Sequence, residues 1–137
     1  MKIPSDYFFG TFDVKPIDGK LWSLQNENQQ WGFIYIGIQI TPPDGMVFDF
    51  ASIPRMAWRV IGPPTGYGKG ANYGASACIH DYLYMSGKLT RKECDKCFLS
   101  AMKALKVSPW RRQLMFRIVR MFGKKYYNRG FNNPEIN

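Results

Sequence analysis

The 137-residue sequence contains only three cysteines and one histidine, and it has no apolar run long enough to cross a bilayer. So small and odd a number of cysteines fits free thiols in a reducing compartment better than a disulfide framework. The longest apolar run, residues 31–38, falls well short of the ~20 residues that a membrane-spanning helix needs, so no transmembrane segment is expected. A proline and an acid precede any apolar stretch at the start, which predicts that no secretory signal peptide is present.

Acidic residues are scarce in the last third of the chain. Residues 1–95 contain nine basic and nine acidic residues, whereas residues 96–137 contain ten basic residues and a single acid, Glu135. The net charge of +9 therefore resides entirely in the C-terminal third. This asymmetry points to a polyanionic partner, for which nucleic acid, anionic lipid and an acidic protein surface are the alternatives.

Length and composition predict one globular domain over residues 1–137. A hydrophobic content of 45%, with 16% aromatic residues, excludes an intrinsically disordered chain. Residues 1–55 have β and loop character, and residues 56–137 have helical character. We therefore expect an α+β fold, in which a small N-terminal antiparallel hairpin or sheet packs on a C-terminal three-helix unit.

The strongest strand pattern lies between residues 31 and 41. Residues 20–24 are predicted to form the other arm of a hairpin with it, and residues 7–14 a further short strand. A serine and a proline at the start of residues 52–60 predict a short helix there. The main strand is expected to turn one apolar face inward, formed by alternate isoleucines at Ile34, Ile36, Ile38 and Ile40.

Three helices are predicted in the second half. The first spans about residues 71–86 and ends before Gly87, a residue type favoured just after a helix. The second begins with a capping box at Thr90 and Glu93, and the third with a serine N-cap and a proline at residues 108–109. The short connection after the first helix predicts a central antiparallel helix hairpin. The inward stripe of the third helix is expected to be Trp110, Leu114, Ile118 and Phe122.

The single histidine, His80, lies in the first predicted helix. Asp95 of the second helix lies level with it, because the two residues are equally far from the connection of the hairpin. A carboxylate on one imidazole nitrogen selects the tautomer and stabilises the imidazolium, so the pair is a candidate general base. The alternative is a structural role, in which Asp95 satisfies the hydrogen-bonding needs of a half-buried His80. Asp81 would then lie on the surface or in an ordinary ion pair.

Asp81 is a hard oxygen ligand of the kind that calcium prefers. With carbonyls of the glycine-rich loop it would form a calcium site that stabilises an oxyanion, and the loop residues concerned are Gly66, Gly68 and Gly70. Residues 62–100 resemble the core of phospholipase A2 enzymes. The resemblance lies in the order of three features along the chain: the glycine-rich loop, then His80-Asp81-x-x-Tyr84, then Asp95-x-x-Phe98. The resemblance implies that His80 is the base for water, Asp81 a calcium ligand, and Asp95 and Tyr84 the orienting partners.

A broader resemblance covers residues 30–125. Asp49-Phe50-Ala51-Ser52-Ile53-Pro54-Arg55 and Ile79-His80-Asp81-Tyr82-Leu83-Tyr84 resemble motifs of a phage and prophage family known only as domain of unknown function thirteen-fifty-three. The resemblance implies a tailed phage or prophage origin, often among virion or tail genes. It implies other phage structural proteins as partners, and the virion or the host cytoplasm as location. Asp49 and Arg55 match the first motif and are expected near His80; the alternative is that Asp49 bonds loop amides.

The third predicted helix and its continuation are rich in cations. A basic amphipathic helix binds anionic lipid or follows nucleic-acid phosphates, and the alternative is a solvated charged face. The candidate residues for an anionic partner are Arg111, Arg112, Arg117, Arg120, Lys124 and Lys125.

Two functions follow from these patterns. One is a virion- or tail-associated phage component that acts through assembly or interaction. The other is a calcium-dependent, phospholipase A2-like hydrolase of host envelope lipid, with His80 as general base. Calcium is the one cofactor implied. Zinc is not expected, because Cys78 and His80 lie on different sides of one helix and cannot both reach one tetrahedral ion.

Overall fold

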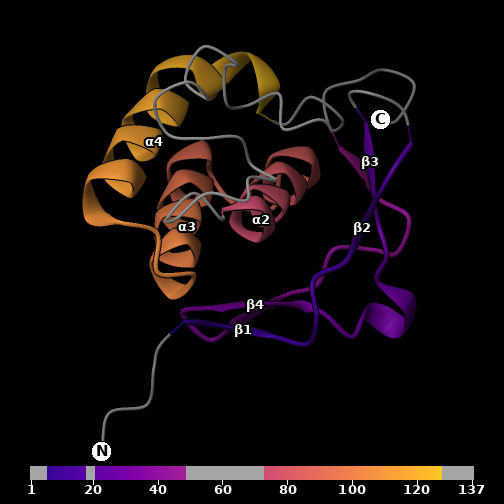
Figure 1. Ribbon diagram of the computed structural model, residues 1–137. Helices are drawn as coiled ribbons and strands as arrows, with labels where there is room; N and C mark the ends of the chain where they lie inside the picture. The colour runs from indigo at the N-terminus through magenta and orange to yellow at the C-terminus, as the bar shows by residue number, and fades with distance from the viewer. Residues whose placement is uncertain (1–5, 18–20, 49–72, 128–137) are drawn as a thin grey trace, which may run out of the picture. The chain divides into compact units, whose positions relative to one another are not determined.

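The computed structural model describes residues 6–17, 21–48 and 73–127 of the chain. The chain divides into two compact units, Met1–Asp49 and Phe50–Asn137. Within the described residues the strands belong to the first unit and the three long helices to the second, which confirms the predicted α+β class (Figure 1). The short helix predicted for residues 52–60 lies outside the described residues.

The described residues of the first unit, 6–17 and 21–48, form two three-stranded antiparallel sheets. In one sheet β4 lies between β1 and β5, and in the other β3 lies between β2 and β6. The bounds of the strands, with one 3-10 turn, are β1 (Tyr7–Phe9), β2 (Val14–Pro16), β3 (Trp22–Leu24), η1 (Glu27–Gln29), β4 (Gly32–Tyr35), β5 (Ile38–Ile40) and β6 (Val47–Phe48).

The prediction of one strand over residues 31–41 is wrong, because this segment is a tight hairpin. β4 and β5 are antiparallel neighbours joined by a two-residue turn, Ile36 and Gly37. Both turn residues have positive φ, 47° and 76°, as the commonest two-residue hairpin turn requires. Such a turn brings odd positions of β4 and even positions of β5 to one face. Phe33 and Ile40 are therefore buried, whereas Ile36 is 66% exposed.

The predicted partner of this strand is also wrong. β3, which includes most of residues 20–24, pairs with β2 and β6, whereas β4 pairs with β1. The further short strand predicted within residues 7–14 is present as β1, and residue 14 begins β2. Aromatic packing accounts for the pairing, because Phe8 of β1 contacts Phe33 of β4 with ring centroids 4.6 Å apart.

The described residues of the second unit, 73–127, contain three long helices, as predicted. They are α2 (Gly74–Ser86), α3 (Arg91–Ala104) and α4 (Pro109–Phe122), followed by a 3-10 turn, η2 (Gly123–Tyr126). α3 packs against both α2 and α4, and Figure 1 shows it between them. None of the helices in the described parts of the chain has the length and apolar character that crossing a membrane requires.

The helix ends follow the local sequence signals. Gly87 ends α2 in the left-handed conformation, with φ of 65°, and its N–H donates to the carbonyl of Leu83. Thr90 caps α3, because its hydroxyl accepts a hydrogen bond from the N–H of Glu93 at 3.2 Å. α4 begins with a proline in its first turn, although the side chain of Ser108 makes no capping bond.

The predicted inward stripe of α4 is wrong by about one residue. Trp110 and Phe122 are 53% and 51% exposed, whereas Met115 and Val119 are fully buried. Residues 114–119 are apolar except for one arginine. The sequence pattern therefore allows several adjacent sides of the helix to be the buried one. Packing against α3 selects the stripe that is buried.

Candidate active site

His80 of α2 and Asp95 of α3 meet in the interior of the helical unit. The Nε2 atom of His80 lies 2.7 Å from Oδ1 of Asp95, and both side chains are completely buried. The imidazole also packs on Tyr84 and Phe98, with ring centroids 4.1 and 4.7 Å away. The contact expected from the hairpin geometry is therefore present.

Asp95 collects hydrogen-bond donors from two neighbouring helices. The hydroxyl of Tyr84, one turn after His80 on α2, donates to Oδ1 at 2.5 Å. The guanidinium of Arg120 on α4 donates to Oδ2 at 2.7 Å. Arg91, one turn before Asp95, places a guanidinium nitrogen 4.0 Å from the same oxygen. The carboxylate therefore links α2, α3 and α4.

The role of Arg120 in this network was not predicted from the sequence. The sequence places Arg120 in a run of cations, and its distance of 25 residues from Asp95 leaves no local signal of the contact. Only the packing of α4 on α3 brings the two side chains together.

The network determines the protonation of its members. Burial lowers the pKa of His80 and outweighs the opposing effect of Asp95. Burial alone would raise the pKa of Asp95, but hydrogen bonds from His80, Tyr84 and Arg120 outweigh it, and this pKa is lowered. At pH 7 the imidazole is thus neutral and the carboxylate ionised. Because a carboxylate only accepts hydrogen bonds, the proton of the neutral imidazole lies on Nε2, toward Asp95.

We expect the free energy of unfolding to fall as the pH drops below 6.5, the ordinary pKa of histidine. Below this pH His80 is protonated in the unfolded chain but stays neutral in the folded chain. The unfolded state therefore binds more protons, and lowering the pH favours unfolding. The lowered pKa of Asp95 acts in the same direction at still lower pH. Urea unfolding at a series of pH values measures the effect. His80→Asn should flatten the profile just below pH 6.5, and an unchanged slope in this variant would contradict the assignment.

The end of α4 closes around Tyr84. A Cβ atom at Gly123 would lie 2.6 Å from the hydroxyl of Tyr84, so the close approach requires glycine. Arg91 donates to the carbonyls of Val119 and Arg120 at 3.1 and 2.9 Å and holds the last turn of α4. The ring of Tyr127 meets Tyr84 edge-on, with centroids 5.3 Å apart. These contacts leave Tyr84 little freedom to move away from Asp95.

Asp81, the expected calcium ligand, lies on α2 directly after His80 and is 9% exposed. Gly66, Gly68 and Gly70, as well as Asp49 and Arg55, lie outside the described residues. Across residues 6–17, 21–48 and 73–127, no three or more side chains of the usual metal-binding types come together. Calcium also takes backbone carbonyl oxygens as ligands, and the glycine carbonyls of the predicted site lie outside the described residues, so the calcium site stays a prediction.

The three cysteines are buried thiols, as expected. Burial raises the pKa of Cys94 to about 12, and it also raises the pKa of Cys78. Cys78 and Cys94 therefore keep their protons near neutral pH, and a protonated thiol is a poor nucleophile.

The six candidate cations for an anionic partner divide into two groups. Three bond within the protein: Arg111 to the Ser108 hydroxyl at 3.3 Å, Arg112 to the Val107 carbonyl at 3.0 Å, and Arg120 to Asp95. The other three, Arg117, Lys124 and Lys125, are exposed.

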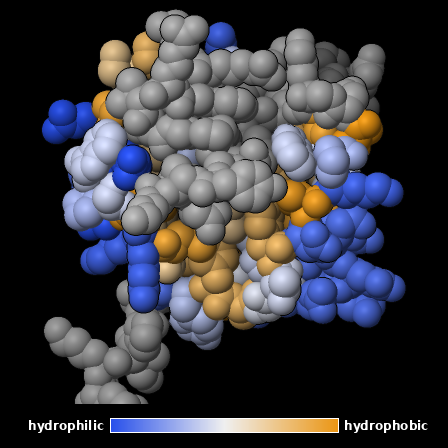
Figure 2. All heavy atoms as spheres, in the orientation of Figure 1, coloured by the Kyte–Doolittle hydropathy of each residue, from blue (hydrophilic) through white to orange (hydrophobic). Residues whose placement is uncertain are grey.

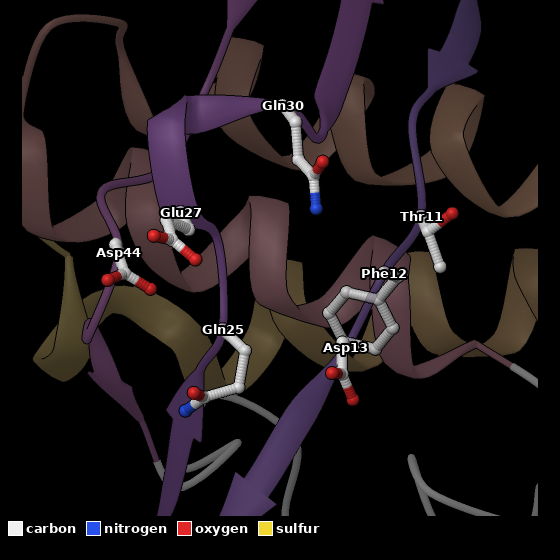
Figure 3. Close-up of a pocket in the computed structure, with 7 residues that line it drawn as sticks. All are labelled: Thr11, Phe12, Asp13, Gln25, Glu27, Gln30 and Asp44. Carbon is white, nitrogen blue, oxygen red and sulfur yellow. The ribbon is translucent and has the colours of Figure 1, made fainter.

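A pocket of about 440 Å³ in the first unit was not predicted from the sequence. Figure 3 shows its lining side chains around an open space. One wall is Phe12, whose ring packs on Trp31 with centroids 4.7 Å apart. Three separate segments contribute to the pocket, which explains the lack of a local signal. The lining residues are Thr11, Phe12, Asp13, Gln25, Glu27, Gln30 and Asp44, with three acids and no base.

Comparison with known proteins identifies the family of the chain. The family described as "Protein of unknown function (DUF1353)" matches residues 30–119. The chain belongs to this family. The DUF1353 match contains His80, Tyr84 and Asp95, whereas Arg120 is the first residue beyond it.

One curated relative is the "Uncharacterized protein y4jT" of Sinorhizobium fredii. It is 32% identical over 121 residues, which cover 85% of this chain and 35% of the relative. The DUF1353 chain thus spans about a third of the length of this relative. No solved structure matches the chain.

Proposed function

We propose that this DUF1353 protein is a hydrolase in which His80 is the general base, with phospholipid esters as its substrate class. The observation that carries the proposal is the hydrogen bond between the imidazole and Asp95, in which the distance from Nε2 to Oδ1 is 2.7 Å. A neutral imidazole whose second nitrogen is basic has the form that proton abstraction from water requires. The resemblance to phospholipase A2 enzymes supplies the substrate class.

In the proposed reaction, Nδ1 of His80 removes a proton from a water molecule while the water oxygen attacks the ester carbonyl. The tetrahedral intermediate then collapses, the bond to the alcohol breaks, and His80 returns the proton to the departing alcohol oxygen. The products are a fatty acid and a lysophospholipid. Asp95 stays ionised throughout and stabilises the imidazolium, and Tyr84 holds the carboxylate in place.

Release of fatty acid from phospholipid vesicles tests the proposal, with calcium added and with a chelator. We expect the wild-type protein to release fatty acid and His80→Asn to lower the rate by at least ~10²-fold, as loss of a general base does. The matched control is Lys96→Gln, an exposed change on α3 that should keep the full rate. His80→Gln is a second variant in case His80→Asn does not fold by circular dichroism.

Two outcomes overturn the hydrolase proposal. One is a folded wild-type protein that releases no fatty acid under either condition. The other is a folded His80 variant that keeps the wild-type rate. Either result would make the His80 and Asp95 pair a structural link between the helices. Asp81→Asn separates the metal question from the base, because only a calcium-dependent rate should respond to it.

We also propose that the protein works as a virion- or tail-associated component of a tailed phage or prophage. Large apolar side chains on the first unit favour contacts with other structural proteins: Ile17, Ile36 and Ile38 are 54%, 66% and 47% exposed. The motif resemblance to phage proteins supplies the setting, and the virion or the host cytoplasm is the expected location. Mass spectrometry of purified particles is the test, and particles without the protein would overturn this proposal.

A further inference from the structure

The exposed side of α4 carries apolar side chains that the fold leaves in solvent. Trp110 is 53% exposed and Met121 is 72% exposed. Residues spaced by four, three and four positions lie along one side of a helix. This side, the outer stripe of α4, consists of Trp110, Leu114, Arg117 and Met121, and it lies away from the buried residues Met115 and Val119.

Exposed cations accompany the outer stripe. Arg117 lies within it, and Lys124 and Lys125 follow directly in η2. From residue 96 to residue 137 the sequence contains one acid, Glu135. On the side where Figure 1 places α4, hydrophilic and hydrophobic residues both reach the surface in Figure 2. The stripe therefore combines apolar area with positive charge.

We infer that the outer stripe of α4 binds the surface of an anionic lipid bilayer. The phosphates of a nucleic-acid duplex are neutralised by cations and offer no apolar contact to the exposed Trp110 and Met121. A bilayer interface takes up apolar side chains at the same time as its anionic headgroups attract lysine and arginine. Tryptophan in particular favours this interface. The guanidinium of Arg111, 4.6 Å from the Trp110 ring centroid, adds a cation beside the aromatic anchor.

The inference does not depend on hydrolysis, and its test is separate. Vesicles made of diether lipids contain no carboxylic ester bond, the bond that the proposed hydrolase would cleave, so they report binding even if the protein has that activity. Co-sedimentation of the 137-residue chain is measured with phosphatidylcholine vesicles and with vesicles that also contain phosphatidylglycerol. We expect binding to the anionic vesicles only, weakening as salt rises, because screening reduces the attraction between headgroups and cations.

Two sets of substitutions separate the two components of the surface. The triple variant Arg117→Gln, Lys124→Gln and Lys125→Gln should weaken binding on the order of 100-fold, from the contribution of each cation near an anionic membrane. The double variant Trp110→Ser and Met121→Ser should weaken it by at least ~10-fold without any change in charge. The matched control removes three exposed lysines elsewhere, Lys15, Lys96 and Lys103, and should bind nearly as the wild type.

Three results would overturn the inference. The first is equal binding to neutral and anionic vesicles, or to neither. The second is unchanged binding in the Trp110 and Met121 variant, since a charged surface alone would then account for it. The third is tighter binding to duplex DNA than to anionic vesicles, with the same affinity for DNA in that variant, which would identify a nucleic-acid surface instead.

Discussion

Replacing Asp95 by alanine is expected to lower the free energy of unfolding by about 3 kcal/mol or more, because it removes the completely buried acceptor of three hydrogen bonds, each of which involves a charged group and contributes about 1.5–3 kcal/mol. The substitution leaves the guanidinium of Arg120 without its carboxylate, and it removes the acceptor of both His80 and Tyr84. These donors come from α2 and α4, so the substitution weakens the packing of both helices on α3. Urea unfolding followed by circular dichroism measures the loss.

Two further variants define this prediction. Asp95→Asn keeps the shape and one carbonyl acceptor but removes the charge, so it should lie between alanine and the wild type. Lys96→Ala, next to Asp95 and exposed, should change stability by less than about 0.5 kcal/mol. A loss below about 1 kcal/mol in Asp95→Ala would contradict the view that this carboxylate holds the three helices together.

Gly123→Ala is expected to destabilise the protein by about 1–3 kcal/mol, the range for overfilling a packed site. The backbone of Gly123 has φ of −76°, so alanine brings no backbone strain and the effect is steric. Its Cβ would lie 2.6 Å from the hydroxyl of Tyr84. That hydroxyl cannot move aside without losing its 2.5 Å bond to Asp95.

A double-mutant cycle with Tyr84→Phe tests this cause. Tyr84→Phe alone should cost about 1.5–3 kcal/mol, because it removes a hydrogen bond to a charged group. When Tyr84→Phe is already present the clash with the hydroxyl is gone, so Gly123→Ala should cost less than in the wild type, by about 1 kcal/mol. Additive losses in the thermal or urea unfolding of the four proteins would contradict the steric account.

Local signals in the sequence were sufficient to predict the three described helices and the contact between His80 and Asp95. Helix ends are determined within a few residues, by Gly87 after α2 and by the Thr90 cap of α3. The short connection between these helices then fixes which positions lie level, and this alone placed Asp95 beside His80. The glycine loop and the motif around Asp49 and Arg55 lie outside the described residues, and their roles stay predictions.

Tertiary contacts decided what local spacing left open. The alternating isoleucines of residues 31–41 fit a strand equally well with either face inward, and the turn at Ile36 and Gly37 selected the aromatic face. In α4 nearly every residue of the middle turns is apolar, so only packing on α3 determined that Trp110 faces solvent. The same packing brings the guanidinium of Arg120, one of a run of cations in the sequence, into a hydrogen bond with Asp95. Residue spacing thus established the helices and their central pair, while contacts between distant segments determined which faces are buried and which charges remain for a partner.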